Sequence, residues 1–99
     1  MQIREFQKLI EETYFARDSS RGTERTFMWF VEEVGELGKA IHRRPDPTGR
    51  NLREEFADVL AWLVTLASLQ GVQIEDAALE KYGRGCPKCG SRPCSCPPA

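Results

Sequence analysis

The sequence lacks long apolar runs and any strong excess of charge of one sign. None of its apolar stretches approaches the roughly 20 residues that a membrane-spanning helix needs. Its first residues, Met1 to Glu5, contain no apolar core of the kind that a signal peptide carries. The net charge of the 99 residues is −1, which gives no general attraction to nucleic acid or to an acidic membrane surface. We therefore expect a cytoplasmic protein without a membrane or nucleic-acid partner.

Histidine and cysteine are also scarce in the main body of the chain. The one histidine, His42, does not lie three residues after any glutamate, so the Glu-x-x-His pairs of a di-iron carboxylate bundle are missing. All four cysteines fall within the last fourteen residues, so they cannot form disulfides that cross-link the main body. A disulfide framework is not expected in a reducing cytoplasm. These absences argue against a di-iron protein and against a disulfide-stapled fold.

Apolar residues recur at helical spacing along most of the chain. In the first segment, Ile3, Phe6 and Ile10 follow this spacing. Turn-forming residues are concentrated in two polar stretches, which we expect to be connections, over residues 17–22 and 43–50. Helices are expected over residues 3–17, about 23–42, 52–70 and 74–82.

This pattern predicts an all-α protein. We expect a small bundle of about four helices over residues 1–82, followed by a Cys-rich tail over residues 83–99. The helix over residues 52–70 has so wide an apolar surface that it should be nearly enclosed. Because a small domain buries only a modest share of its surface, part of that enclosure is expected from a second subunit in a homodimer or homotetramer.

Two pairs of carboxylates lie at matching places in two of the expected helices. Glu33 and Glu36 form one pair, Glu55 and Asp58 the other, and residues three apart are neighbours on a helix surface. If the adjoining apolar faces pack antiparallel, the two acidic edges meet and a divalent cation relieves their repulsion. Oxygen-only ligands favour Mg²⁺ or Mn²⁺ over zinc. The alternative interpretation is that these carboxylates simply line the solvent faces of amphipathic helices.

Basic and aromatic residues near these pairs are candidates for substrate contacts. Lys39, Arg43 and Arg53 lie around the connection between the acidic helices and are predicted to bind phosphate, which arginine grips with its forked guanidinium group. Trp29 is close to the first pair in helical phase and is the candidate for stacking on a base, although such a tryptophan is more often in a core or an interface. Three further arginines flank the earlier connection: Arg17, Arg21 and Arg25.

The tail carries the spacing of a metal-binding knuckle. Cys86 and Cys89 form a C-x-x-C motif followed by glycine, and Cys94 and Cys96 form a tighter C-x-C motif. Four thiolates in one short loop can enclose a tetrahedral Zn²⁺ ion. The tail has no acidic residue or histidine to act as a general base, so a zinc ion here would be structural. Redox activity and free thiols are the alternatives.

Together, the two acidic motifs resemble those of the MazG-like nucleotide pyrophosphohydrolases. The matching text is E-E-x-x-E at residues 32–36 and E-x-x-D at residues 55–58, continued by A-W-L-V at residues 61–64. The resemblance spans residues 3–82 and leaves out the cysteine tail. It implies that Mg²⁺ is bound by Glu33, Glu36, Glu55 and Asp58. It also implies that Glu32 holds a second metal ion or orients the attacking water.

The resemblance further implies an activity. Members of this family are helical bundles that form dimers or tetramers, and they cleave nucleoside triphosphates to a monophosphate and pyrophosphate. Removal of non-standard nucleotides is the implied role. A substrate such as phosphoribosyl-ATP, dCTP or dUTP is an alternative. A function of a different class is a non-catalytic dimeric adaptor whose zinc-binding tail contacts a partner. Conversion of Glu33 and Asp58 to amides would separate the enzyme from the adaptor.

Overall fold

The described part of the chain folds into four helices. The computed structural model describes residues 1–43 and 48–98, and within them it has the helices α1 (Ile3–Arg21), α2 (Thr23–Arg43), α3 (Arg50–Leu69) and α4 (Ile74–Tyr82). No strand occurs in these two ranges, and the tail after α4 consists of turns and bends. The predicted all-α fold with a Cys-rich tail is thus confirmed. Residues 44–47 of the predicted connection over residues 43–50 lie outside the described residues.

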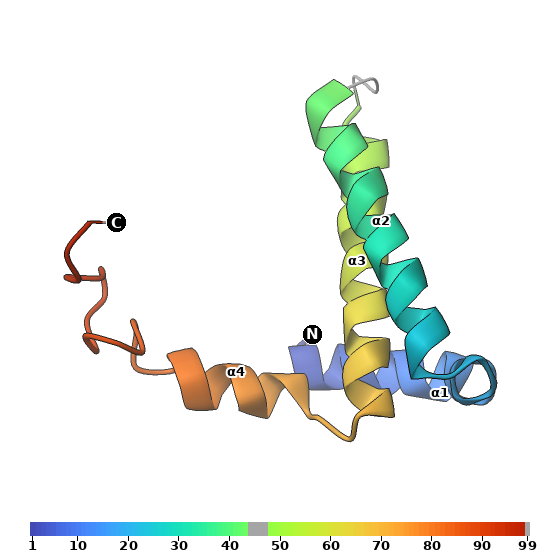
Figure 1. Cartoon of the computed structure of the whole chain (residues 1–99), viewed down its shortest axis with the longest axis horizontal. Coiled ribbons are helices and arrows are strands. Elements are labelled where there is room, and N and C mark those ends of the chain that lie inside the picture. The colour runs from blue at the N-terminus through green and yellow to red at the C-terminus, as the bar shows by residue number, and fades with distance from the viewer. Residues whose placement is uncertain (44–47, 99) are drawn as a thin grey trace.

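The helices form an open arrangement rather than a closed bundle. Helices α2 and α3 run antiparallel side by side, α1 crosses one end of this pair, and α4 leads away from that end with the tail (Figure 1). The radius of gyration is 16.1 Å, whereas a compact domain of this length has about 13 Å. No single described helix is long and apolar enough to cross a membrane; by length and composition alone, α3 and α4 together would be, and they are bent by 96° relative to each other.

Helix α1 is one turn longer than the sequence predicts. Residues 18–21 were expected to belong to the connection, but they continue the helix to Arg21. The reason is tertiary, because the Asp18 carboxylate is buried and accepts hydrogen bonds from Arg21 Nη1 (3.0 Å) and from Thr65 Oγ1 of α3 (3.4 Å). Gly22, with a φ of 84°, then ends α1 and lets α2 begin at the next residue.

Gln7 connects α1 by hydrogen bonds to the end of α3 and to the turn between α3 and α4. Its side chain is buried, and its amide nitrogen donates hydrogen bonds to Ser68 Oγ (3.0 Å) and to the carbonyl oxygen of Val72 (2.9 Å). Its amide oxygen accepts a hydrogen bond from the backbone N–H of Ile74 at 3.1 Å. A single polar side chain therefore sets the place where α4 and the tail leave the rest of the molecule.

Large apolar side chains remain half exposed in the single chain. Among the described residues only Ala40 and Val64 are buried apolar residues. The accessible surface is 7801 Å², while a folded monomer of 11.2 kDa exposes about 5,700 Å². The exposed apolar residues of the α2–α3 pair include Phe27, Val34, Ile41, Phe56, Leu60 and Leu63. The apolar stripes of the two acidic helices are therefore only partly covered by each other.

Candidate functional site

The packing of α2 against α3 brings three of the four predicted magnesium ligands together. Glu33 of α2 and both Glu55 and Asp58 of α3 each offer a carboxylate oxygen, and these three atoms lie within 4.8 Å of one another. Because the two helices run antiparallel (Figure 1), carboxylates from distant parts of the sequence meet at one level of the helix pair. We call Glu33, Glu55 and Asp58 the carboxylate cluster.

The carboxylate cluster is electrostatically unfavourable by itself. Loss of solvent raises the pKa of Glu33, and repulsion from Asp58 and Glu55 raises it further. Loss of solvent and repulsion from Asp58 likewise raise the pKa of Glu55. One carboxylate oxygen of Glu55, Oε2, is buried and has no hydrogen-bond partner among the described residues. A buried carboxylate oxygen without a partner is costly unless it is protonated or bound to a cation. This donor set therefore fits a hard divalent cation, which prefers oxygen ligands.

Glu36, the fourth predicted magnesium ligand, lies outside the carboxylate cluster. Its Oε1 atom is 3.5 Å from Lys39 Nζ in an exposed ion pair along α2. It is nevertheless near enough to contribute to the raised pKa of both Glu33 and Glu55. A residue three places after Glu33 is rotated by about 60° around the helix axis, as Asp58 is relative to Glu55. On α2 this rotation turns the second carboxylate of the pair toward solvent.

Glu32 and Trp29 of α2 do not belong to the carboxylate cluster. Both are exposed, and together with Arg25 and Met28 they line a surface depression. The ring of Trp29 stacks against that of Trp62 from α3, with centroids 6.4 Å apart and planes inclined by 19°. The catalytic role of Glu32 and the base contact of Trp29 stay predictions.

A cavity of about 310 Å³ opens beside Asp58, between α1 and α3. Tyr14 and Trp62 give it aromatic walls, and Arg17 and Arg21 add two guanidinium groups. The Cζ atom of Arg21 lies 4.9 Å from the centroid of the Trp62 ring, a cation–π contact. Ring faces and guanidinium groups in one cavity suit a ligand that has both a planar ring and anionic groups.

This cavity is the main feature that sequence reasoning misses. Ending the first helix at residue 17 places Arg21 in a loop and hides its relation to Arg17. The available signal is the spacing of Asp18 and Arg21, which is that of an ion pair within a helix.

The predicted phosphate ligands lie elsewhere. Arg43 and Arg53 are exposed, at the end of α2 and the beginning of α3, and neither lines the cavity. Lys39 is engaged with Glu36. Their contact with phosphate stays a prediction.

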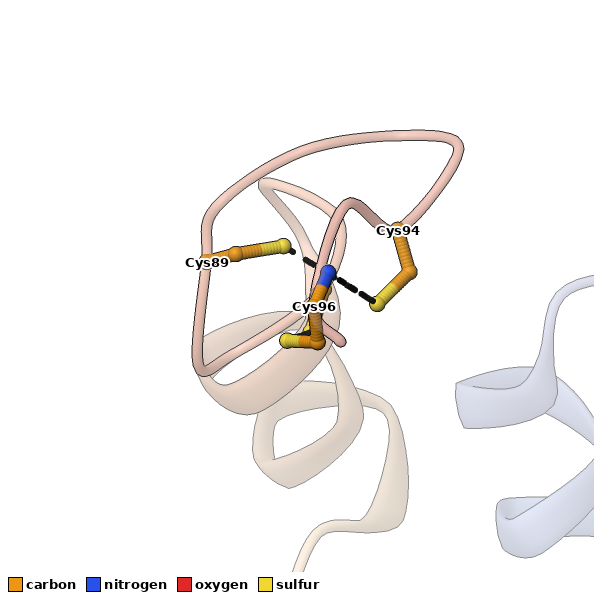
Figure 2. Close-up of side chains that lie close together, drawn as sticks. Cys89, Cys94 and Cys96 are labelled. Carbon is orange, nitrogen blue, oxygen red and sulfur yellow. Dashed lines mark hydrogen bonds between the residues drawn. The ribbon is translucent and has the colours of Figure 1, made fainter. Parts of the chain in front are cut away.

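The four cysteines of the tail form a second cluster. Their Sγ atoms lie within 4.8 Å of one another, and Figure 2 shows Cys89, Cys94 and Cys96 directed into the same space. Hydrogen bonds from Ser95 lower the pKa of Cys89 to about 5. The neighbouring sulfurs of Cys94 and Cys86 raise the pKa of Cys96 to about 11. We call these four residues the cysteine cluster.

Comparison with known proteins assigns the chain to a family. Residues 21–90 match the MazG nucleotide pyrophosphohydrolase domain. The chain belongs to this family. The match confirms the resemblance seen in the acidic motifs, and MazG proteins generally use a divalent metal ion. The matched range includes the whole carboxylate cluster but ends before Cys94 and Cys96. A search of curated proteins finds no match for the chain.

Proposed function

We propose that this MazG protein hydrolyses nucleoside triphosphates between the α- and β-phosphates, releasing a nucleoside monophosphate and pyrophosphate. The observation that supports this best is the carboxylate cluster, which has a buried oxygen without a partner among the described residues and lies next to a cavity with aromatic and guanidinium walls. The family supports the reaction class. Clearance of non-standard nucleotides from the cellular pool is the proposed role.

Glu33, Glu55 and Asp58 would hold the metal ion, Mg²⁺ or in its place Mn²⁺, and Glu36 is the fourth candidate ligand. When bound, the ion neutralises charge on phosphate oxygens and orients them. The protein contributes by holding three carboxylates close together, one of which, Glu55, has a buried oxygen. This arrangement favours cation binding, because binding removes repulsion that is otherwise relieved only by protonation.

The cavity beside Asp58 would receive the nucleotide. Arg17 and Arg21 would offer guanidinium groups to phosphate oxygens, and the aromatic wall at Trp62 would contact the base. Trp29 stacks on Trp62 and so supports the proposed base platform. Lys39, Arg43 and Arg53 are proposed to approach the outer phosphates from the exposed side of the helix pair.

Glu32 is the proposed general base. It would accept a proton from the water that attacks phosphorus, so that a new P–O bond forms as the bond to the pyrophosphate leaving group breaks. Two features support this role: Glu32 lies beside Glu33 in the E-E-x-x-E motif, and its side chain is exposed to solvent. A Glu32→Gln variant should lose turnover while it keeps affinity for a divalent cation.

A homodimer or homotetramer would cover the exposed apolar face of α2 and α3. The surface of the chain exceeds that of a compact monomer by about 2,000 Å², and one subunit of an obligate dimer buries about 1,000–2,500 Å². Light scattering on the eluate of a sizing column measures the mass directly. A monomer at micromolar concentration would contradict this part of the proposal.

Product analysis tests the proposed reaction. The protein is incubated with Mg²⁺ and a panel of ribo- and deoxynucleoside triphosphates, and the nucleotides are separated by chromatography. We expect monophosphate and pyrophosphate, lost in Glu33→Gln and kept in the control Glu24→Gln, which changes an exposed glutamate in the first turn of α2. Diphosphate with orthophosphate would contradict the proposal. No turnover with intact metal binding would favour phosphoribosyl-ATP as substrate or a non-catalytic adaptor.

A further inference from the structure

We propose that Cys86, Cys89, Cys94 and Cys96 form a structural, tetrahedral zinc site that is independent of the carboxylate cluster. With Zn–S bonds of about 2.3 Å, the sulfurs of a regular tetrahedral site lie about 3.8 Å apart. The sulfurs of Cys86 and Cys96 are 3.7 Å apart, and those of Cys89 and Cys94 are 3.9 Å apart. The four sulfurs therefore surround a space of the size that a zinc ion occupies, and Figure 2 shows three of the four cysteines.

Backbone N–H groups point at these sulfurs. The N–H of Ser95 donates to Cys89 Sγ and the N–H of Cys96 donates to Cys94 Sγ, each at 3.3 Å. The backbone N–H groups of Cys89 and Lys88 also form hydrogen bonds to the sulfur of Cys86. Hydrogen bonds of this kind stabilise thiolates and orient metal ligands from outside the coordination shell. The chain thus presents three sulfurs with partners suited to negative charge.

Two glycines give the loop the turns that it needs. Gly90, with a φ of 72°, follows Cys89 and donates its N–H to the carbonyl oxygen of Cys86 at 2.7 Å. Gly85 has a φ of 111°, and a Cβ atom there would lie 2.8 Å from the carbonyl oxygen of Ser91. That same oxygen accepts the N–H of Cys86 at 3.0 Å. Since a side chain would be strained at either glycine, the sequence specifically permits the fold that gathers the sulfurs.

The charge and ligand type also fit zinc. Four thiolates around Zn²⁺ carry a net charge of about −2. The tail offers Arg84, Lys88 and Arg92 and contains no acidic residue to oppose them. An all-sulfur tetrahedral set selects zinc or an iron–sulfur centre over Mg²⁺ or Mn²⁺. All four ligands come from the protein, so no coordination position is left for substrate and the site is structural.

The location separates this site from the proposed reaction. Helix α4 carries the tail away from the α2–α3 pair that holds the carboxylate cluster (Figure 1). Zinc would therefore fix residues 86–96 as a rigid knuckle at the end of α4 without touching the carboxylates. The proposal stands whether or not the protein is a pyrophosphohydrolase.

Metal analysis of the full chain without an affinity tag tests the proposal. After dialysis against metal-free buffer, elemental mass spectrometry should find about one zinc ion per chain. Replacement by Co²⁺ should give the thiolate-to-cobalt charge-transfer band and the visible bands of tetrahedral cobalt. No stoichiometric metal with four freely reacting thiols would overturn the proposal, as would two disulfides or stoichiometric iron.

Matched variants identify the ligands. Cys89→Ser and Cys96→Ser should each lower zinc affinity by more than about 100-fold, because even outer partners of metal ligands are worth about 10- to 100-fold. Cys94→His should keep zinc but change the cobalt spectrum, since an imidazole replaces one thiolate. The control Ser91→Ala removes a hydroxyl and no thiol and should keep zinc. Circular dichroism checks that the helices persist in every variant. Unchanged zinc affinity in both serine variants would overturn the assignment.

Discussion

The carboxylate cluster and the cysteine cluster assemble metal-binding side chains in opposite ways. The carboxylate cluster joins one residue of α2 to two of α3, so its geometry depends on how two helices pack. The cysteine cluster takes all four ligands from residues 86–96 and depends on local turns. The difference shows that the spacing of ligand residues along the chain can define a site formed within one loop. A site made between helices also needs the rotation of each helix about its axis.

The two clusters also differ in chemistry and surroundings. Carboxylate oxygens suit hard cations such as Mg²⁺, and thiolates suit zinc. The carboxylate cluster adjoins a cavity between α1 and α3 through Asp58, whereas the cysteine cluster lies in the tail, where Cys89 and Cys94 are exposed. We therefore expect changes in the first cluster to affect turnover and changes in the second to affect only local order in the tail.

The largest expected effect comes from Glu55→Gln. It removes the charge of the carboxylate whose Oε2 is buried without a hydrogen-bond partner among the described residues, and turnover should fall by at least about 100-fold, as expected for loss of a metal ligand. The matched control is Glu54→Gln, one residue earlier, which breaks only an exposed ion pair with Arg50. Steady-state kinetics at saturating Mg²⁺ measures both. Equal losses in the two variants would contradict the assignment of Glu55.

A smaller effect on substrate affinity is expected from Trp62→Leu. Stacking of a base on an aromatic ring is worth about 1–3 kcal/mol, so KM should rise by about 5- to 150-fold while kcat changes little. Trp29→Leu is the matched comparison, because Trp29 stacks on Trp62 but does not line the cavity. A larger rise of KM in Trp29→Leu would favour Trp29 over Trp62 as the base contact.

Gln7→Ala should destabilise the helical body without affecting the cysteine cluster. It leaves Ser68, Val72 and the N–H of Ile74 without their partner, which should lower the free energy of unfolding by about 2 kcal/mol. Gln70→Ala removes one exposed hydrogen bond to Thr23 and should cost less than about 0.5 kcal/mol. Urea unfolding measures both. Loss of zinc from folded Gln7→Ala protein would show that the tail depends on the body.

The smallest expected effect is a pH dependence specific to the carboxylate cluster. The pKa values of Glu33 and Glu55 are raised in the folded state above the ordinary value of 4.5. Their contribution to stability is therefore fully present below pH 4.5 and is lost as the pH rises through the raised values. The Tm of the metal-free protein should decline over this range relative to that of Glu55→Gln. Mg²⁺ should offset the decline. Parallel curves for the two proteins would contradict the coupling.

Much of the fold follows from the sequence, because helical spacing is a local signal. Helix α4 has the predicted bounds, Ile74–Tyr82. Helix α1 extends past its predicted end because Asp18 is buried against Thr65 of α3. No local pattern reveals that contact. Propensity alone treats Ser19 and Ser20 as loop residues, and a tertiary hydrogen bond overrides it.

The candidate sites were predictable to different degrees. The spacing of the cysteines indicated their cluster, since a short loop leaves few arrangements. For the carboxylates, the i,i+3 spacing indicated both pairs, but it did not reveal that Glu36 would pair with Lys39. The cavity with Arg17, Arg21 and Trp62 depends on α1 crossing α3, which no motif records.

The most direct test is a crossed metal analysis of three proteins: the wild type, Glu55→Gln and Cys86→Ser. Bound Mn²⁺, used in place of Mg²⁺, is counted by electron paramagnetic resonance, and zinc is counted in the same samples by elemental mass spectrometry. We predict that Glu55→Gln loses Mn²⁺ binding and keeps zinc, while Cys86→Ser loses zinc and keeps Mn²⁺ binding. Wild-type affinity for Mn²⁺ in Glu55→Gln would contradict the claim that the carboxylate cluster is the metal centre of this MazG protein.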